Sequence, residues 1–215
     1  MKIVIKIGGS VSIGRDGPNF SYFNKLLPVL EQLKKRNQVI LAIGGGQITR
    51  IYGKSVEKFA ISNREKELIY LELIKANVRF LASMLKMRPI FTLDEIKPNT
   101  RGVIGGIAPG RSTDANAAIA AARIRADIFI KLTNVNGVYD KDPNKFRSAK
   151  KFDKISFAGM KKLAVKGRPN KYGVLDKLAI KALSSAKIKT VVVNGKDPEN
   201  ITRVLHGENL GTTVR

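Results

Sequence analysis

Glycine-rich segments follow three of the predicted strands and could bind phosphate groups. They read GGS at 8–10, GGG at 44–46 and GGIAPGRSTD at 105–114. Glycines at a strand end let backbone N–H groups converge on an anion, and the positive end of the next helix adds to the attraction. One such loop can be an ordinary turn, which needs only one or two glycines. The three segments together therefore favour phosphate binding.

Three cationic side chains accompany these loops. Lys6 lies at the end of the first predicted strand, where a transferring phosphoryl group would lie, although it could also be a surface lysine. Arg50 follows the second loop by one helical turn and can bind phosphate through two parallel hydrogen bonds. Arg111 lies in the third loop. Phosphoryl transfer needs such cations because its two anionic reactants repel each other.

A carboxylate, Asp114, ends the third loop and precedes an alanine-rich helix. It could cap that helix, or it could orient Lys6 or a glycine loop, and the two roles are compatible. Ser112 or Thr113 could serve as the cap instead.

Two common nucleotide-binding motifs are absent. The spacing from Gly9 to Gly14 fits a P-loop, but Arg15 and Asp16 stand where the motif needs lysine and a hydroxyl residue. The dinucleotide fingerprint fails after Gly44 and Gly46, because Thr49 replaces its last glycine.

The composition describes a globular chain and excludes several kinds of chemistry. Its 215 residues, 43% apolar and 27% charged, predict one domain, or one domain with a small lobe. The absence of cysteine excludes disulfides, thiolate metal sites and cysteine catalysis. The one histidine, His206, is expected on the surface, so a histidine-based triad is not expected.

The net charge is strongly positive, because 40 lysines and arginines outnumber 17 acidic residues and give +23. Such a chain could bind polyanions, and a basic nucleic-acid-binding protein is one alternative. The charge is spread through the sequence without an aromatic RNA platform or a zinc pattern, which disfavours that alternative. No apolar run approaches 18 residues and the N-terminus does not read as a signal peptide, so we expect a cytoplasmic protein that does not enter a membrane.

Apolar periodicity predicts alternating strands and helices. The predicted strands are 2–7, 39–43, 89–92, 103–104, 127–132 and 190–193. The predicted helices are 20–36, 48–59, 64–85, 115–123, 155–165, 174–186 and 198–205. This order predicts a mostly parallel sheet covered on both faces, with ligands beyond the carboxyl ends of its strands. Segment 161–171, which is basic and contains glycine and proline, is the expected mobile loop.

Seven segments, in the same order from end to end, resemble the archaeal-type uridylate (UMP) kinase family of the amino acid kinase superfamily. They are KIGGS at 6–10, GGGQITR at 44–50, GGIAPGRSTDANAA at 105–118, DIFIKLTNVNGVYDKDP at 127–143, VLDKLAIKAL at 174–183, KTVVVNG at 189–195 and GTTV at 211–214. The resemblance implies transfer of the γ-phosphoryl group of ATP to UMP, with Mg²⁺, in a homohexamer. It also implies a three-layer αβα sandwich with a mostly parallel central sheet.

The resemblance further implies one domain over 1–215, with an acceptor-binding part at about 1–125 and an ATP-binding part at about 126–215. It assigns catalytic roles to Lys6, Arg50, Asp114 and Asp176. It assigns ATP binding to Gly9, Ser10, Gly46, Arg50, Thr133, Tyr139 and Asp142. It assigns UMP binding to Gly45, Glu67, Ile107, Ala108, Pro109, Gly110, Arg111, Ser112 and Thr113. It gives no residue of this chain as a metal ligand and requires no nucleic acid.

This sequence departs from the family pattern at two positions. Lys177 stands where the family usually has proline after Asp176, and Asn136 stands where aspartate is common. Other kinases of the superfamily remain alternatives. Isopentenyl phosphate kinases would have a histidine after the second glycine loop, which this chain lacks. Acetylglutamate and aspartate kinases typically have a second catalytic lysine at the position of Asp176.

Overall fold

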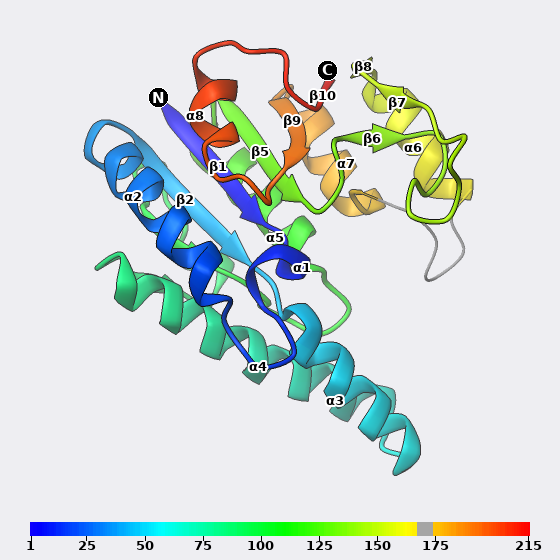
Figure 1. Ribbon diagram of the computed structural model, residues 1–215. Coiled ribbons are helices and arrows are strands. Elements are labelled where there is room, and N and C mark those ends of the chain that lie inside the picture. Colours follow the sequence, from blue (N-terminus) through cyan, green and yellow to red (C-terminus); the bar gives the residue numbers. More distant parts are fainter. Residues whose placement is uncertain (167–173) are drawn as a thin grey trace.

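The computed structural model describes residues 1–166 and 174–215, and it is an α/β structure (Figure 1). A central eight-stranded sheet has the order β3-β4-β2-β1-β5-β9-β10-β8. Its strands are β1 (Lys2–Ile7), β2 (Gln38–Ile43), β3 (Pro89–Ile90), β4 (Gly102–Ile104), β5 (Ile128–Thr133), β8 (Lys154–Ile155), β9 (Lys189–Asn194) and β10 (Thr212–Val214). A small separate hairpin pairs β6 (Val138–Tyr139) with β7 (Lys151–Phe152).

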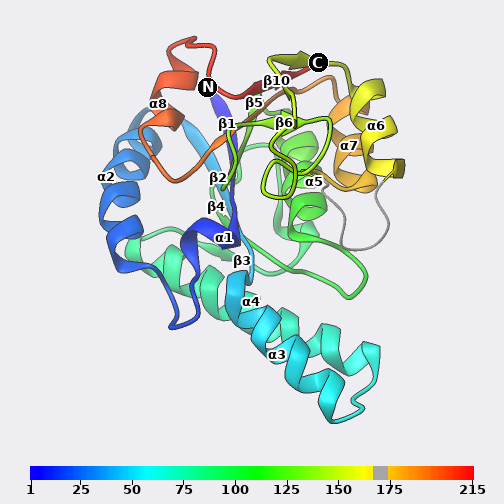
Figure 2. The same ribbon diagram turned by 45° about the vertical axis from the view of Figure 1, so that its right-hand side comes forward.

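Helices cover both faces of the sheet (Figure 2). They are α1 (Gly9–Ser12), α2 (Phe20–Arg36), α3 (Gly46–Lys58), α4 (Asn63–Met84), α5 (Thr113–Ile124), α6 (Phe157–Lys166), α7 (Lys177–Ser185) and α8 (Asn200–Leu205). A 3-10 turn, η1, spans Leu93–Glu95. The mostly parallel, three-layer αβα fold expected from the sequence is confirmed.

Alternation along the buried strands explains the two helical layers. Successive side chains of a strand point to opposite faces of a sheet. Accordingly Ile3, Ile5 and Ile7 of β1 pack with α2, α4 and α8, whereas Val4 packs with α5 and α7 on the other face. The centre of the sheet is therefore apolar on both faces, and polar side chains can enter the fold only at the strand ends.

The structure corrects several predicted boundaries. Residues 155–165 do not form one helix, because Ile155 ends β8 and α6 begins at Phe157. Residues 174–176 precede α7, because the Asp176 side chain caps that helix. Strand β9 is not the last strand of the chain, as the sequence predicted, since β10 follows and pairs with it in the antiparallel direction. In the expected mobile loop, 161–166 belong to α6, and 167–171 lie outside the described residues.

Helices α3 and α4 lie side by side and form an arm that extends away from the sheet (Figures 1 and 2). Helix α4 begins at a capped end, where the Ser62 side chain accepts a hydrogen bond from the Glu65 backbone N–H. Within residues 1–166 and 174–215, no helix combines the length and the apolar character needed to cross a bilayer.

Candidate active site

A cavity of about 320 Å³ opens at the carboxyl ends of β1, β2 and β5. Since these strands are parallel neighbours, their carboxyl ends meet at one edge of the sheet. Most residues around the cavity are glycines, hydroxyl residues and cations, with one aspartate and one leucine. The lining residues are Lys6, Gly8, Gly9, Ser10, Gly44, Gly45, Gly46, Thr49, Arg50, Thr113, Asp114, Lys131, Leu132 and Thr133. The arrangement is suited to polyanionic phosphate groups. We refer to it as the phosphate cavity.

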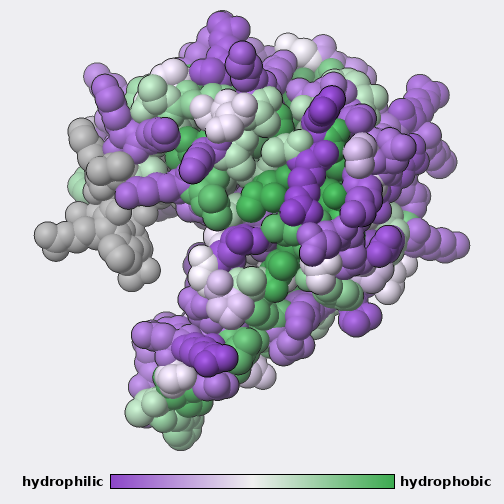
Figure 3. Space-filling model, turned by 180° about the vertical axis from the view of Figure 1, so that it is seen from behind, coloured by the Kyte–Doolittle hydropathy of each residue, from purple (hydrophilic) through white to green (hydrophobic). Residues whose placement is uncertain are grey.

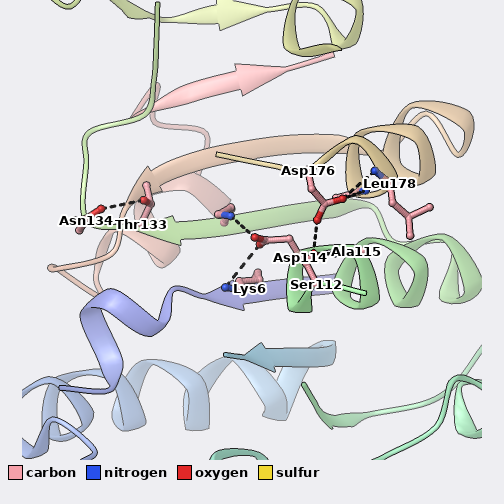
Figure 4. Close-up of polar contacts among 10 residues, drawn as sticks. Lys6, Ser112, Asp114, Ala115, Thr133, Asn134, Asp176 and Leu178 are labelled. Carbon is pink, nitrogen blue, oxygen red and sulfur yellow. Dashed lines mark hydrogen bonds and ion pairs between the residues drawn. The ribbon is translucent and has the colours of Figure 1, made fainter. Parts of the chain in front are cut away.

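Two lysines and one aspartate form a buried ionic cluster in this cavity (Figure 4). Lys131 Nζ donates a hydrogen bond to Asp114 Oδ2 at 2.7 Å, and Lys6 Nζ lies 3.7 Å from Asp114 Oδ1. Both lysine side chains are only 9% exposed. Lys6 and Lys131 are register partners on β1 and β5, so both ammonium groups project from the same edge. The cluster places two positive charges where phosphate would enter.

Burial and charge act in opposite directions on these groups. Burial lowers the pKa of the Lys6 ammonium, Asp114 opposes that shift, and the nearby Lys131 charge adds to it, so the pKa falls below its usual value. Burial raises the pKa of the Asp114 carboxyl, but the attraction of Lys131 and Lys6 outweighs it and the pKa lies below its usual value. Asp114 is therefore ionised at neutral pH and holds the two lysines together.

The glycines of the first two loops allow the backbones to approach closely. A Cβ atom on Gly9 would lie 2.5 Å from the Gly46 nitrogen, which leaves no space for a side chain. Gly46 itself has a φ of +65°, in the left-handed region that glycine adopts without strain. The Gly8 backbone N–H also donates to the Leu132 carbonyl at 3.0 Å. These contacts bring the loops after β1, β2 and β5 together around one space.

Two buried asparagines that were not predicted from the sequence fix the loop backbones. Asn77 on α4 donates its amide N–H to the Gly44 carbonyl at 3.0 Å, and Asn116 on α5 donates to the Gly105 carbonyl at 2.9 Å. Lys131 was not predicted either, because its strand reads as an ordinary apolar strand. Its position, at the end of a strand that precedes a polar loop, is the same signal that identified Lys6.

A second cavity, also of about 320 Å³, lies between α4 and the loop before α5. It is lined by Glu67, Tyr70, Leu71, Ile74, Gly106, Ala108, Pro109, Gly110, Arg111, Ser112 and Thr113. The Glu67 carboxylate accepts a hydrogen bond from the Gly110 backbone N–H at 2.7 Å, which ties the loop to α4. Thr113 lines both cavities, so the second cavity adjoins the first. We call it the acceptor cavity. In Figure 3 a concavity separates the α3–α4 arm from the body.

The N-terminus of α5 is capped by Ser112 and not by Asp114. Ser112 Oγ accepts a hydrogen bond from the Ala115 backbone N–H at 2.9 Å. Asp114 lies two residues further on, inside the helix, and its carboxylate faces the lysines instead. The expectation that Asp114 could orient Lys6 thus agrees with the geometry, whereas its capping role falls to Ser112.

Asp176 lies at the start of α7 and lines neither cavity. Its Oδ1 accepts hydrogen bonds from the Leu178 and Ala179 backbone N–H groups, each at 2.9 Å. Its Oδ2 accepts a hydrogen bond from the Ser112 hydroxyl (Figure 4). Asp176 therefore connects the N-termini of α5 and α7, and it reaches the acceptor cavity only through Ser112.

The remaining candidate residues are divided between the cavities and their surroundings. Gly45 lines the phosphate cavity and not the acceptor cavity. Ile107 lines neither, because it packs against the buried apolar cluster beneath α5. Thr133 lines the phosphate cavity, whereas Tyr139 lies on β6 and Asp142 in the loop that follows it. Asp142 accepts hydrogen bonds from the backbone and side chain of Asn144.

The chain offers little to a metal ion at this site. In the described parts of the chain, no group of three or more histidine, cysteine, aspartate or glutamate residues is placed to hold one. Asp114, the carboxylate of the phosphate cavity, already faces Lys6 and Lys131. A cage built from protein ligands therefore does not fit these residues.

Comparisons with known proteins agree with this arrangement. The model of the amino acid kinase family matches residues 1–96 and 75–194. A uridylate kinase of Thermococcus kodakarensis is 33% identical over 100% of this chain and 99% of its own length. That of Archaeoglobus fulgidus is 34% identical over the full length of both chains. The crystal structure of the Archaeoglobus fulgidus uridylate kinase superposes with a TM-score of 0.86 over 100% of both chains.

Proposed function

The chain belongs to the amino acid kinase family, and we propose that it is a UMP kinase, which transfers the γ-phosphoryl group of ATP to UMP and yields UDP and ADP. The observation that carries the proposal is the pair of adjoining cavities that share Thr113. One is cationic and glycine-lined, and the other is closed by Glu67 and the loop before α5. Full-length relatives named uridylate kinase support UMP as the acceptor.

The acceptor phosphate needs no general base. The second pKa of a phosphate monoester is about 6, so UMP is largely a dianion at pH 7 and its oxygen is already nucleophilic. This agrees with the exposed position of His206 after α8. An oxygen of the acceptor phosphate attacks the γ-phosphorus, the bond to the β-bridging oxygen breaks, and ADP leaves with that electron pair.

Catalysis then depends on placing two anions next to each other. Two unit charges 4 Å apart interact by about 4 kcal/mol at an effective dielectric constant of 20, and several such pairs repel here. Lys6 and Lys131 offset this repulsion from inside the cavity, and Arg50 does so from just after the first turn of α3. Because Asp114 and burial hold the lysines in place, they need little reorganisation during the reaction.

The assignment of substrate groups to residues is a proposal that rests on the resemblance to the family. ATP phosphates lie against Gly9, Ser10 and Gly46, with Arg50 between the two nucleotides. The ATP ribose and adenine lie toward Thr133, Tyr139 and Asp142. The UMP phosphate and uracil contact the loop at 107–113, and the ribose contacts Glu67. All acceptor contacts in this assignment come from residues 1–125, and the contacts to the ATP ribose and adenine come from 126–215. A cytoplasmic location remains a prediction from the sequence, and a homohexamer remains a prediction from the resemblance.

Mg²⁺ is expected to enter with ATP. This ion commonly keeps several waters and is bound through substrate phosphates with few protein carboxylates. When bound, it would neutralise part of the phosphate charge. The carboxylates described above do not form a cage for it.

A coupled assay of ADP release tests the proposal. The assay compares UMP, CMP, acetylglutamate and no acceptor, at equal ATP and Mg²⁺ concentrations. We expect turnover with UMP well above the acceptor-free background. Turnover of another acceptor, with UMP at background level, would exclude the assignment.

A further inference from the structure

The amino ends of the parallel strands carry cationic side chains that the proposed kinase reaction does not use. They precede or begin β2, β3, β4, β5 and β9, and we call them the basic edge. The set comprises Lys34, Lys35, Arg36, Lys86, Arg88, Lys97, Arg101, Arg123, Arg125, Lys187 and Lys189. Because these strands are parallel, the basic edge lies at the opposite end of the sheet from the phosphate cavity.

A third cavity, of about 410 Å³, lies within the basic edge. Five of its six lining residues are cations, and Met87 is the sixth. The cations are Lys34, Lys35, Lys86, Arg88 and Arg101. They come from the end of α2 and from the segments before β3 and β4. In Figure 3, which views the molecule from behind, hydrophilic side chains cover the right-hand side. This cavity is a concave cationic surface.

Most of the charge on the basic edge is not neutralised within the chain. Lys34 pairs with Glu31 at 2.7 Å, Arg88 with Glu95 at 2.6 Å, and Arg123 with Asp94 at 3.6 Å. The other eight cations of the edge form no ion pair within residues 1–166 and 174–215. A strong positive potential therefore remains at this edge.

Helix dipoles explain only part of the pattern. The helices run back against the strands, so their negative C-termini lie at this edge and favour cations in the last turn. Lys34, Lys35 and Arg36 of α2 and Arg123 of α5 satisfy that preference. Lys97 and Arg101 do not follow an α-helix, and the effect fades within one turn. Helix dipoles therefore do not account for all of the cations at the basic edge.

The residue types and the length of the basic edge indicate which ligand it would bind. The lining of the cavity contains no aromatic residue on which a base could stack, so it favours phosphate groups over nucleobases. Five strand spacings of about 4.8 Å separate β3 from β9, so the edge spans about 24 Å. One strand of a duplex carries a phosphate about every 3.4 Å along the helix axis, so a stretch of duplex as long as the edge carries about seven phosphates per strand. The third cavity within this row is concave, which suits a chain of phosphates better than a planar layer of lipid headgroups.

We propose that the basic edge binds the phosphate backbone of a nucleic acid, without reading its bases, at a surface separate from the kinase site. Binding at this surface neutralises the unpaired cations and releases the counterions of the nucleic acid. The proposal does not depend on UMP being the acceptor of the kinase reaction.

Two matched triple variants of the full chain test the proposal. The edge variant carries Lys35→Gln, Lys86→Gln and Arg101→Gln, all at exposed positions that line the third cavity. The control variant carries Arg64→Gln, Lys161→Gln and Lys162→Gln, at exposed positions on α4 and α6. Both remove three positive charges. Fluorescence anisotropy measures binding of two labelled duplexes of equal length and unrelated sequence across a series of salt concentrations.

We expect the wild type to bind both duplexes equally and to lose affinity steeply with salt. The edge variant should lower the slope of log K against log[salt] by about three, roughly one unit for each phosphate that no longer meets a cation. The control variant should keep the wild-type slope. Thermal unfolding and UMP turnover, which should match the wild type in both variants, show that the fold is intact.

Three results would overturn the proposal. Equal weakening of binding in both triple variants would mean that general basicity, and not the basic edge, attracts the duplex. Absence of duplex binding in the wild type, with inorganic polyphosphate still bound, would exclude a nucleic acid as the ligand. A preference for one duplex sequence that the edge variant retains would place binding elsewhere.

Discussion

Asp114 shows how one residue can organise a cationic site. Two lysine side chains, each only 9% exposed, lie on either side of its carboxylate. Removing one partner from a buried ionic group leaves the other charges uncompensated, which costs about 3–5 kcal/mol. Here the two lysines would also repel each other. The carboxylate thus permits Lys6 and Lys131 to be buried and charged at the same time.

Asp114→Asn should lower the free energy of unfolding by about 3–5 kcal/mol at pH 7, because it leaves two buried cations without their counterion. Urea unfolding measures this decrease. Asp153→Asn is the matched control, since Asp153 forms an ion pair with Lys151 on the surface, where its side chain is 72% exposed. That variant should unfold almost as the wild type does.

The effect of Asp114→Asn depends on pH with a defined sign. The folded protein holds the pKa of Asp114 below its usual value of 3.8, so the ionised carboxylate stabilises the fold above about pH 4. That contribution is lost as pH falls through the folded pKa. The difference in stability between variant and wild type should therefore shrink below pH 4. A difference that grows on acidification would contradict the assigned role.

Arg50 is a cation at the proposed site, whereas Lys177 is a cation outside it, so substitutions of the two should have different effects on activity. Arg50 lines the phosphate cavity, whereas Lys177 is the exposed first residue of α7 and lines neither cavity. Arg50→Ala should reduce kcat/KM for UMP phosphorylation by at least 100-fold, equivalent to about 2.7 kcal/mol of transition-state stabilisation. Lys177→Ala should remain within a few-fold of the wild type. Equal reductions in steady-state assays would refute these roles.

At the scale of elements, a hydrogen bond between Ser112 and Asp176 joins the N-termini of α5 and α7. Ser112 caps α5 and donates its hydroxyl hydrogen to Asp176, which in turn caps α7. Helix α5 begins in the loop that closes the acceptor cavity, and α7 packs beside it. The link therefore fixes the end of the loop before α5 against α7.

Substitutions at Asp176 can distinguish its helix-capping role from the effect of its negative charge. Asparagine is as good an N-cap as aspartate, whereas alanine costs about 1 kcal/mol at such a position. Asp176→Asn should therefore keep the stability but lower UMP turnover, and Asp176→Ala should lower both. Parallel measurements of kcat and of urea unfolding test this. Wild-type turnover in Asp176→Asn would show that the charge of Asp176 has no part in catalysis.

At the scale of the whole molecule, the two ends of the sheet carry cations for different reasons. The carboxyl end holds two buried lysines and the exposed Arg50 around glycine loops, and the amino end holds many exposed cations. With a net charge of +23, the exposed cations repel one another throughout the folded chain. Salt should reduce this repulsion, because the Debye length falls from about 30 Å at 0.01 M to about 8 Å at 0.15 M.

The midpoint of thermal unfolding should therefore rise when sodium chloride increases from about 0.01 to about 0.15 M. A gain of about 1 kcal/mol would raise Tm by about 2–4 °C in a domain of this size. Differential scanning calorimetry measures the shift. The edge variant, which carries three fewer positive charges, should show a smaller rise. A Tm that falls with chloride would mean that attractive ion pairs, and not repulsion, dominate the surface electrostatics.

The layered fold, and the end of the sheet at which we place the candidate site, could be predicted from local patterns in the chain. Apolar runs of period two and amphipathic segments of period 3.6 are local properties, so they identify most strands and helices without tertiary information. Glycines at strand ends, with Lys6 and Arg50 beside them, were enough to predict phosphate binding at the carboxyl ends. Very short strands such as β8 and β10 carry too little pattern to be recognised, since they form only by pairing with distant neighbours.

The pairing of side chains around the site depends on how the elements pack. Lys131 and Asp114 are 17 residues apart, and Ser112 and Asp176 are 64 apart. Such pairings result from the packing of α5 against the sheet and against α7, which no local periodicity encodes. The choice of Ser112 over Asp114 as the helix cap has the same origin, because buried lysines require a carboxylate and leave the cap to the neighbouring hydroxyl.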